Sequence, residues 1–366
     1  MTTTSPTSTP VSEDRLESFG EEVFEATLAA LELTVQAMGR ELGLYESLRG
    51  TPSTPGELAT RAHVDARYAR EWLEHQAVAQ VLSVENPEAP ADDRRYTLPE
   101  EHAIGLLDED HPAYVGALAD FIPVIARTLE HVQTAFRTGE GVPFAAYELH
   151  DMQAGFTRPM FANSLTTEWL PELPELHRRL EAGEPLRVLD LGCGEGWAGI
   201  YLAEAYPAVT IDGLDLDDAS IARAREHAAD RGVGDRVRFE LRDIGDPSIN
   251  GPYDLAMCCE VIHDLPDPVS ALATMRRVTA HGGDALVIDE RVANSFEPSG
   301  DPIERLMYAI SILHCLPAGR VTDTSVATGT VMRADTFQTY AQQAGFASVD
   351  ELPIDHQLFR FYRPVG

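Results

Sequence analysis

The chain has 366 residues, of which 44% are hydrophobic and 24% charged, values typical of a folded globular protein, and this length suggests two domains. Sixty acidic and 28 basic residues give a formal net charge of −32 at pH 7, which opposes binding to a nucleic acid. No apolar run reaches the roughly 20 residues of a membrane helix, and the four cysteines form no CxxC pair. We expect a cytoplasmic protein with no metal, nucleic-acid partner or membrane partner.

The N-terminal region divides into a tail and a helical segment. Residues 1–12, "MTTTSPTSTPVS", are small and polar and lack the features of a signal peptide, so we predict a disordered tail. From residue 13 to 49, apolar side chains recur every three to five positions. This spacing predicts one or two amphipathic helices.

Residues 54–98 have the pattern of two helices followed by a wing. Thr54, Pro55 and Glu57 combine an N-cap, a first-turn proline and a capping-box acid, so a helix begins there. A second helix is predicted from about Asp65 to Val81, and "RRYTL" at 94–98 indicates a returning strand. We therefore predict a winged helix-turn-helix.

A winged helix could belong to a transcriptional regulator. The second helix holds Arg67 and Arg70 against Asp65, Glu71 and Glu74, whereas DNA-reading helices concentrate basic residues on one face. We therefore interpret residues 13–110 as a mainly helical winged-helix domain that forms a homodimer. The apolar pattern of residues 112–137 predicts a further helix, so residues 111–155 are expected to be a helical linker.

A glycine-rich loop opens the remaining part of the chain. In "LRVLDLGCGEGWAGIYLAEAYP", at 186–207, a strand ends at Asp190, glycines follow at 192, 194 and 196, and a helix begins near Trp197. Such loops let a ligand approach the backbone closely. A dinucleotide-binding loop would need a third glycine where Trp197 stands, so NAD fits poorly.

The pattern D-x-G-x-G-x-G resembles motif I of class I S-adenosylmethionine-dependent methyltransferases, and three later stretches, "VTIDGLDLDD", "VRFELRDI" and "YDLAMCCEVIHDL", agree with it in order and spacing. The resemblance implies an α/β fold, a doubly wound seven-stranded Rossmann-like sheet over residues 156–366. It also implies S-adenosyl-L-methionine as the cofactor. The cofactor-binding residues it implies are Asp190, Gly192, Gly194, Gly196, Asp215, Leu216, Asp243, Ile244 and Glu260.

Within this resemblance, Asp215 stands where the family binds the ribose and Asp243 where it binds the adenine amino group. Taken alone, Asp215 could instead cap the helix that begins near Asp217, and Asp243 could simply end a strand. Glu260 stands at the edge of the cofactor or caps a solvent-facing end.

His263 follows the fourth strand, at the position where small-molecule O-methyltransferases carry a catalytic histidine in an "HDW" context. Here the context is "HDLPDP", which many class I methyltransferases without a catalytic base share. His263 is therefore either the general base that takes a proton from a hydroxyl acceptor or a loop residue bonded to backbone.

The acceptor side is expected to involve two segments. An insertion at 293–332, containing the amphipathic segment "DPIERLMYAISILHCLP", is typical of a lid over the acceptor pocket in this family, and "AAYELHDMQAGFTRPMF" precedes motif I. The residues predicted to line the acceptor pocket are His150, Phe156, Met160, Tyr308 and His314.

The whole arrangement resembles a bacterial group of winged-helix methyltransferases. It implies transfer of a methyl group from S-adenosylmethionine to a small molecule, with a hydroxyl of secondary metabolism as the expected acceptor. Two alternatives remain at this point. One is a cofactor-binding enzyme with non-methylating, cyclase-like chemistry, and the other is a cofactor-responsive transcriptional regulator.

Overall fold

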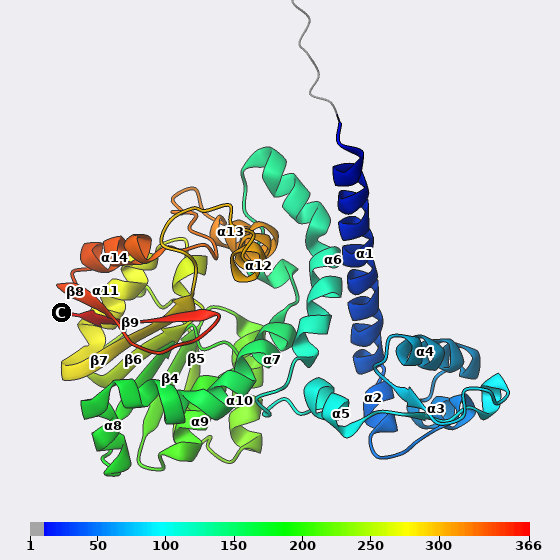
Figure 1. Ribbon diagram of the computed structural model, residues 1–366. Helices are drawn as coiled ribbons and strands as arrows, with labels where there is room; N and C mark the ends of the chain where they lie inside the picture. The colour runs from blue at the N-terminus through cyan, green and yellow to red at the C-terminus, as the bar shows by residue number, and fades with distance from the viewer. Residues whose placement is uncertain (1–10) are drawn as a thin grey trace, which may run out of the picture. The chain divides into compact units, whose positions relative to one another are not determined.

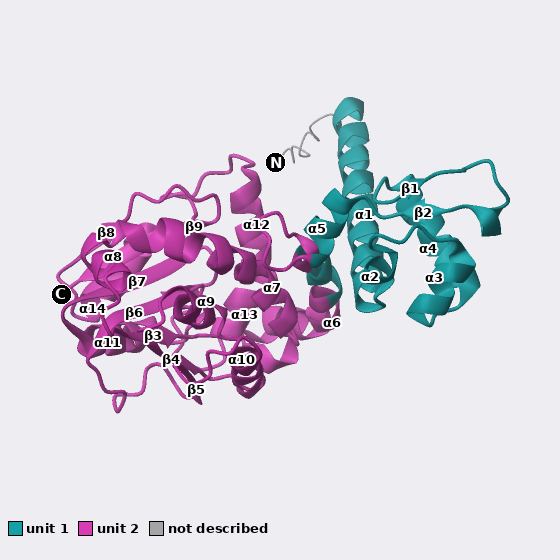
Figure 2. Cartoon of the chain, turned by 90° about the horizontal axis from the view of Figure 1, so that it is seen from below, with its two compact units in different colours: residues 1–107, 118–123 teal, residues 108–117, 124–366 magenta. Residues whose placement is uncertain are grey.

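The computed structural model describes residues 11–366, so most of the predicted tail at 1–12 lies outside the described residues. The chain forms two compact units, the first reaching residue 107 and including 118–123, and the second comprising 108–117 and 124–366 (Figure 2). Among the described residues, no helix is both long and apolar enough to cross a bilayer. Each unit is described by itself below.

The first unit is a winged helix-turn-helix. Its elements in chain order are α1 (Glu13–Glu41), α2 (Leu44–Leu48), α3 (Pro55–Ala62), α4 (Ala66–Val78), β1 (Ser83–Val84), η1 (Ala91–Asp93), β2 (Tyr96–Thr97) and α5 (Glu100–Leu107). The predicted capping box is present, because the side chain of Thr54 accepts from the N–H of Glu57 and Glu57 accepts from the N–H of Thr54. Asp65 caps α4, and the antiparallel pair β1–β2 forms the wing.

The second unit is an α/β domain. Its helices are α6 (Gly116–Thr138, shared with the first unit), η2 (Phe144–Ala146), α7 (His150–Met160), η3 (Phe161–Trp169), η4 (Leu170–Glu172), α8 (Pro174–Glu181), α9 (Trp197–Ala205), α10 (Asp218–Asp230), η5 (Ile262–Asp264), α11 (Pro268–Val278), α12 (Pro302–Ile310), η6 (Ser311–Cys315), α13 (Leu316–Gly319) and α14 (Ala334–Gln343). Its strands are β3 (Arg187–Leu191), β4 (Thr210–Asp215), β5 (Val237–Leu241), β6 (Tyr253–Cys259), β7 (Thr279–Glu290), β8 (Ser348–Glu351) and β9 (Phe359–Val365).

The sheet has the order β5-β4-β3-β6-β7-β9-β8 (Figure 1). Strands β3 to β7 are parallel, and β9, the last strand of the chain, runs antiparallel to both β7 and β8. The chain winds outward from β3 to β5 and then returns to the other side of β3 with β6. Ligands of doubly wound sheets bind beyond the carboxyl ends of the strands at such a reversal.

Two apolar layers cover the sheet. Side chains alternate across β3, so Val188 packs with residues of α8, α9 and α10, whereas Leu189 and Leu191 pack with residues of α11 and α14. Both layers are closed by large side chains, and on the first face the rings of Trp169 and Phe361 lie 5.1 Å apart. This packing holds the carboxyl ends of β3, β4 and β6 in fixed positions.

Candidate cofactor and acceptor site

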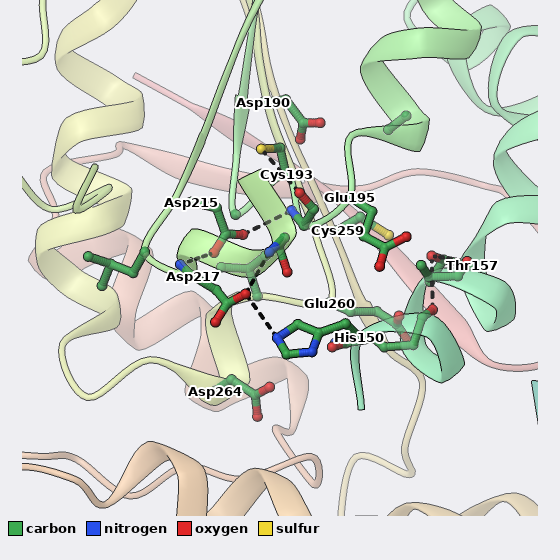
Figure 3. A pocket seen from close by; sticks show the side chains of 18 of the residues that line it. His150, Thr157, Asp190, Cys193, Glu195, Asp215, Asp217, Cys259, Glu260 and Asp264 are labelled. Atoms are coloured by element: carbon green, nitrogen blue, oxygen red, sulfur yellow. Dashed lines mark hydrogen bonds and ion pairs between the residues drawn. The ribbon is translucent and has the colours of Figure 1, made fainter. Parts of the chain in front are cut away.

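A cavity of about 380 Å³ lies beyond the carboxyl ends of β3, β4 and β6, with α7 on its opposite wall (Figure 3). Six acidic residues line it, and no arginine does. They are Asp190, Glu195, Asp215, Asp217, Glu260 and Asp264. Because this excess of carboxylates disfavours an anionic ligand, the cavity suits a cationic or neutral one.

The three motif glycines have different roles. All have positive φ, at +73° for Gly192, +50° for Gly194 and +82° for Gly196. A Cβ on Gly194 would meet nothing within 4 Å, whereas one on Gly196 would lie 2.3 Å from Cζ of Phe239. Gly192 and Gly194 line the cavity and Gly196 does not. The missing side chain of Gly196 makes room for the core, and its contact with the cofactor remains a prediction.

Asp215 is held by the glycine loop. Its Oδ2 accepts from the N–H of Gly194 and its Oδ1 from the N–H of Asp217, both at 2.9 Å. The cap of α10 is Asp217, which accepts from the N–H of Ser220 at 2.7 Å, so Asp215 is not the helix cap. Burial raises the pKa of Asp215. A ligand that donates hydrogen bonds would satisfy this carboxylate.

Asp190 is the most deeply buried carboxylate of the cavity. Its residue is 3% exposed and its Oδ2 has no hydrogen-bond partner among the described residues. Burial, together with the charge of Asp215, raises the pKa of Asp190 to about 7. S-adenosylmethionine has an ammonium, a sulfonium and a ribose diol, and these groups fit the unpaired Asp190, the acidic lining and Asp215.

Of three further residues predicted to bind the cofactor, two line the cavity. Leu216 and Ile244 line it, but Asp243 does not. Asp243 instead accepts from the N–H of Gly245 at 2.8 Å, a local turn in which the carboxylate stabilises its own loop.

His263 lies in a buried ionic cluster. The residue is 2% exposed, and its Nδ1 lies 2.8 Å from Oδ1 of Asp289 and 2.7 Å from Oε2 of Glu290. Its Nε2 lies 3.2 Å from Oδ1 of Asp264. Burial alone would lower its pKa, but the charges of Asp264, Glu290 and Asp289 raise the pKa of His263 well above its ordinary value. Asp264 lines the cavity, while His263 lies behind it.

Glu260 lies on the cavity wall directly after β6. It has a φ of +56°, a conformation that non-glycine residues rarely adopt. Its N–H donates to the carbonyl of Ile288 at 2.8 Å, which anchors the backbone to β7. Burial raises the pKa of Glu260 to about 7, against the opposing charge of His263.

One face of α7 lines the cavity. His150, Gln153, Ala154 and Thr157 contribute to the lining, and Phe161 at the start of η3 extends it. Nε2 of His150 lies 2.9 Å from Oδ2 of Asp217, so this residue reaches the cofactor side.

Phe156 and Met160, predicted as acceptor residues, pack against the core cluster and do not line the cavity. The helical repeat explains this difference, because neighbouring positions point about 100° apart.

His314 and Tyr308 lie in the predicted insertion. The predicted amphipathic helix is interrupted, because α12 runs into the π-helical segment η6, which buries His314 and Cys315. The ring of His314 lies edge-on to that of Tyr147 at 4.6 Å, and burial lowers the pKa of His314. Tyr308 accepts from Nη2 of Arg333 at 3.2 Å. Neither lines the cavity.

Several lining residues were not predicted as site residues, among them Glu195 and Trp197. Glu195 forms an ion pair with Arg223 at 2.9 Å, and burial and the charge of Glu109 raise its pKa to about 7. The position of Glu195 between Gly194 and Gly196 of the glycine loop could have identified it as a lining residue. Trp197 stacks on His227 at 4.5 Å and lies 3.8 Å from the guanidinium of Arg158.

Comparisons with known proteins agree with this architecture. A family model described as "Methyltransferase domain" matches residues 183–325, and one described as "Rv2258c-like winged HTH domain" matches residues 29–107. The chain is 30% identical to the ubiquinone biosynthesis O-methyltransferase of Pseudomonas aeruginosa strain LESB58 over 138 residues, 38% of this chain and 56% of that protein. It is 28% identical to the 27-O-demethylrifamycin SV methyltransferase of Amycolatopsis mediterranei over 167 residues, covering 45% and 55%. An uncharacterized Synechococcus protein is 36% identical over 107 residues, 29% of this chain and 25% of that protein.

The chain thus spans between a quarter and just over half of the length of these relatives. Solved structures resemble it along nearly its whole length. The mitomycin 7-O-methyltransferase MmcR superposes with a TM-score of 0.68 at 20% identity, covering 96% of this chain and 99% of MmcR. Human N-acetylserotonin methyltransferase in complex with SAM superposes with a TM-score of 0.67 at 17% identity, covering 98% and 99%. Residues 183–325 thus match a methyltransferase domain and residues 29–107 an Rv2258c-like winged HTH domain, and the solved methyltransferase structures share the fold along nearly the whole chain.

Proposed function

We propose that this protein transfers a methyl group from S-adenosylmethionine to a hydroxyl group of a small molecule of secondary metabolism. The observation that carries the proposal is the cavity at the sheet reversal, where Asp190 and Asp215 flank the glycine loop and no arginine lines the wall. When bound, the cofactor supplies a methyl group on a positively charged sulfonium. A surrounding set of carboxylates stabilises that charge.

Individual residues would hold different parts of the cofactor. Asp215 would accept from the ribose hydroxyls, because a carboxylate has about four acceptor sites and the N–H groups of Gly194 and Asp217 occupy only two of them. Leu216 and Ile244 would flank the adenine. Asp190 and the backbone of the loop at Gly192 would face the amino-acid end. Most of the rate enhancement is then expected from alignment of the acceptor oxygen with the methyl group.

The acceptor would lie between α7 and the loop after β6. His150 is a proposed wall residue, and Tyr308 and His314 remain proposed acceptor residues of the insertion. His263 as general base also remains a prediction, and its buried ion pairs bear on it below. Similarity to enzymes named as rifamycin and mitomycin O-methyltransferases supports a hydroxyl acceptor and secondary metabolism.

We also propose a homodimer formed through the winged-helix unit. Helix α1 exposes a row of large apolar side chains, including Leu16, Phe19, Phe24 and Leu31. Such a row normally marks a contact surface. Light scattering on the purified protein tests this, and Phe19→Glu with Phe24→Glu should shift the mass to that of a monomer.

The test of function incubates the purified protein with methyl-labelled S-adenosylmethionine and an extract of the cells from which the protein comes. Calorimetry first measures cofactor binding, and mass spectrometry then detects labelled products. A labelled small molecule supports methyl transfer. A protein that binds the cofactor and converts a molecule without transferring label supports the cyclase-like alternative, and absence of cofactor binding refutes the proposal.

A further inference from the structure

Two of the carboxylates that line the cavity, those of Asp190 and Glu260, have no hydrogen bond or ion pair to a side chain or to the backbone within the described part of the chain. They lie at different places. Asp190 is in β3 beside Asp215, on the side of the glycine loop. Glu260 follows β6 and shares its loop with His263 and Asp264, on the side where an acceptor would meet the methyl group.

The backbone of Glu260 is held in an unfavourable conformation. A left-handed φ is unfavourable for an ordinary L-residue, and glycine or asparagine would avoid much of this cost. The neighbouring structure fixes it, because the N–H of Glu260 donates to Ile288 in β7. Residues kept in such conformations cluster at functional sites. The conformation directs the carboxylate to the cavity wall rather than along the strand.

The cation nearest to Glu260 is already paired. His263 contacts Asp289 and Glu290 through Nδ1 and Asp264 through Nε2. An imidazole surrounded by three carboxylates holds both of its protons, so it has no lone pair with which to accept another. The carboxylate of Asp264 is a poor proton acceptor. Burial would raise its pKa, but the charge of His263 outweighs burial and lowers the pKa of Asp264 to about 2.

We propose that Glu260, and not His263, is the catalytic base that takes the proton from the acceptor hydroxyl. This inference rests on the proposed methyl transfer. The acceptor oxygen forms a bond to the methyl carbon, the carbon–sulfur bond breaks with its electron pair leaving on sulfur, and the hydroxyl proton moves to a carboxylate oxygen of Glu260. His263 is then a positioning residue that neutralises part of the acidic cluster behind Glu260.

The charges around Glu260 agree with this role. The charges that act on it are those of His263 and Asp264 from its own loop and of Asp289 from β7, and the titratable groups Asp190 and His150 line the same cavity. Burial is the main reason that its pKa is raised, to about 7. A carboxylate that titrates near neutral pH is a better proton acceptor than one that titrates near 4.

The first test needs no acceptor. With ¹³C-labelled glutamate, NMR follows each carboxyl between about pH 5 and pH 9. Glu195 and Glu260 should both titrate near neutral pH, and the Glu260 resonance is the one that is absent from Glu260→Gln and retained in Glu226→Gln, an exposed control on α10 that removes the same charge. We also expect His263 to carry both ring protons across this range. A Glu260 carboxyl that is ionised throughout, or a His263 that titrates as a free imidazole, overturns the proposal.

The second test measures turnover with labelled cofactor and producer extract at pH 7. Glu260→Gln should lower the initial rate by about 10² to 10⁴, the usual effect of removing a positioned base, while Glu226→Gln should stay within about twofold of wild type. Calorimetry should show that Glu260→Gln binds S-adenosylmethionine nearly as wild type does. Turnover of Glu260→Gln at half the wild-type rate overturns the proposal. If wild type itself fails to bind the cofactor, the proposed function fails, and the NMR result still decides the state of Glu260.

Discussion

The motif glycines provide a matched test of the site, because Gly194→Ala and Gly196→Ala make the same chemical change two residues apart. Both positions have positive φ, which costs alanine roughly 1 to 2 kcal/mol. At Gly196 the new Cβ would lie 2.3 Å from Cζ of Phe239 and 3.0 Å from Cβ of Ala224. Phe239 is fully enclosed in the core, so this overlap adds about 1 to 3 kcal/mol. We expect Gly196→Ala to lose about 2 to 5 kcal/mol of unfolding free energy.

Gly194→Ala should behave differently. No atom lies within 4 Å of its new Cβ, so only the backbone cost of roughly 1 to 2 kcal/mol applies to stability. That Cβ would instead occupy space in the cavity, and an overlap of about 1 to 3 kcal/mol with the cofactor corresponds to roughly 5- to 150-fold weaker binding. Gly232→Ala, with φ +70° and open space around it, serves as the control for backbone cost.

Urea unfolding monitored by tryptophan fluorescence measures stability, and calorimetry with S-adenosylmethionine measures affinity. The reasoning is refuted if Gly196→Ala unfolds at the same urea concentration as Gly232→Ala. It is equally refuted if Gly194→Ala binds the cofactor as tightly as wild type does.

Three further predictions concern the acidic groups. Asp215→Ala should weaken cofactor binding by about 1 to 3 kcal/mol per lost contact, measured by calorimetry, and unchanged affinity in a folded variant would remove Asp215 from the site. His263→Gln should lose about 3 to 5 kcal/mol of unfolding free energy, measured in urea, because the buried carboxylates around His263 lose their cation. A His263→Gln variant as stable as wild type would show that these ion pairs contribute nothing to stability. Asp190, Glu195 and Glu260 have pKa values of about 7 in the folded state, above roughly 4 in the unfolded chain, so the folded state binds more protons between these values. The free energy of unfolding of the ligand-free protein should therefore fall as pH rises from about 4 to about 7 and then stay level. Unfolding is measured in high salt, where surface charges are screened, and a free energy of unfolding that rises across this pH window contradicts the prediction.

The sequence predicted features that depend on local pattern. Thr54 and Glu57 cap α3 because a capping box needs only four consecutive residues. Asp190 and Asp215 end neighbouring parallel strands, and in a doubly wound sheet such ends meet at one edge, so their convergence followed from order alone.

Features that depend on distant partners could not be predicted in this way. Nothing near Gly196 in sequence indicates that Phe239 occupies the space above it. The carboxylate of Asp289 is 26 residues beyond His263, and only the pairing of β6 with β7 brings the two together. Phe156 was assigned to the acceptor pocket by its place in the segment ahead of motif I, but the direction of its side chain is set by how α7 packs.

The π-helical segment η6 has a consequence for how acceptor preference could change. A π turn contains one residue more than an α turn of similar rise, and in η6 this places Ser311, His314 and Cys315 in buried positions. Deleting a single residue there would restore the α pitch and rotate the following side chains by about 100°. A different set of groups would then be presented beside Asp264 without any substitution. Engineering by single-residue deletion and insertion in η6 thus reaches side-chain arrangements that no library of point substitutions contains.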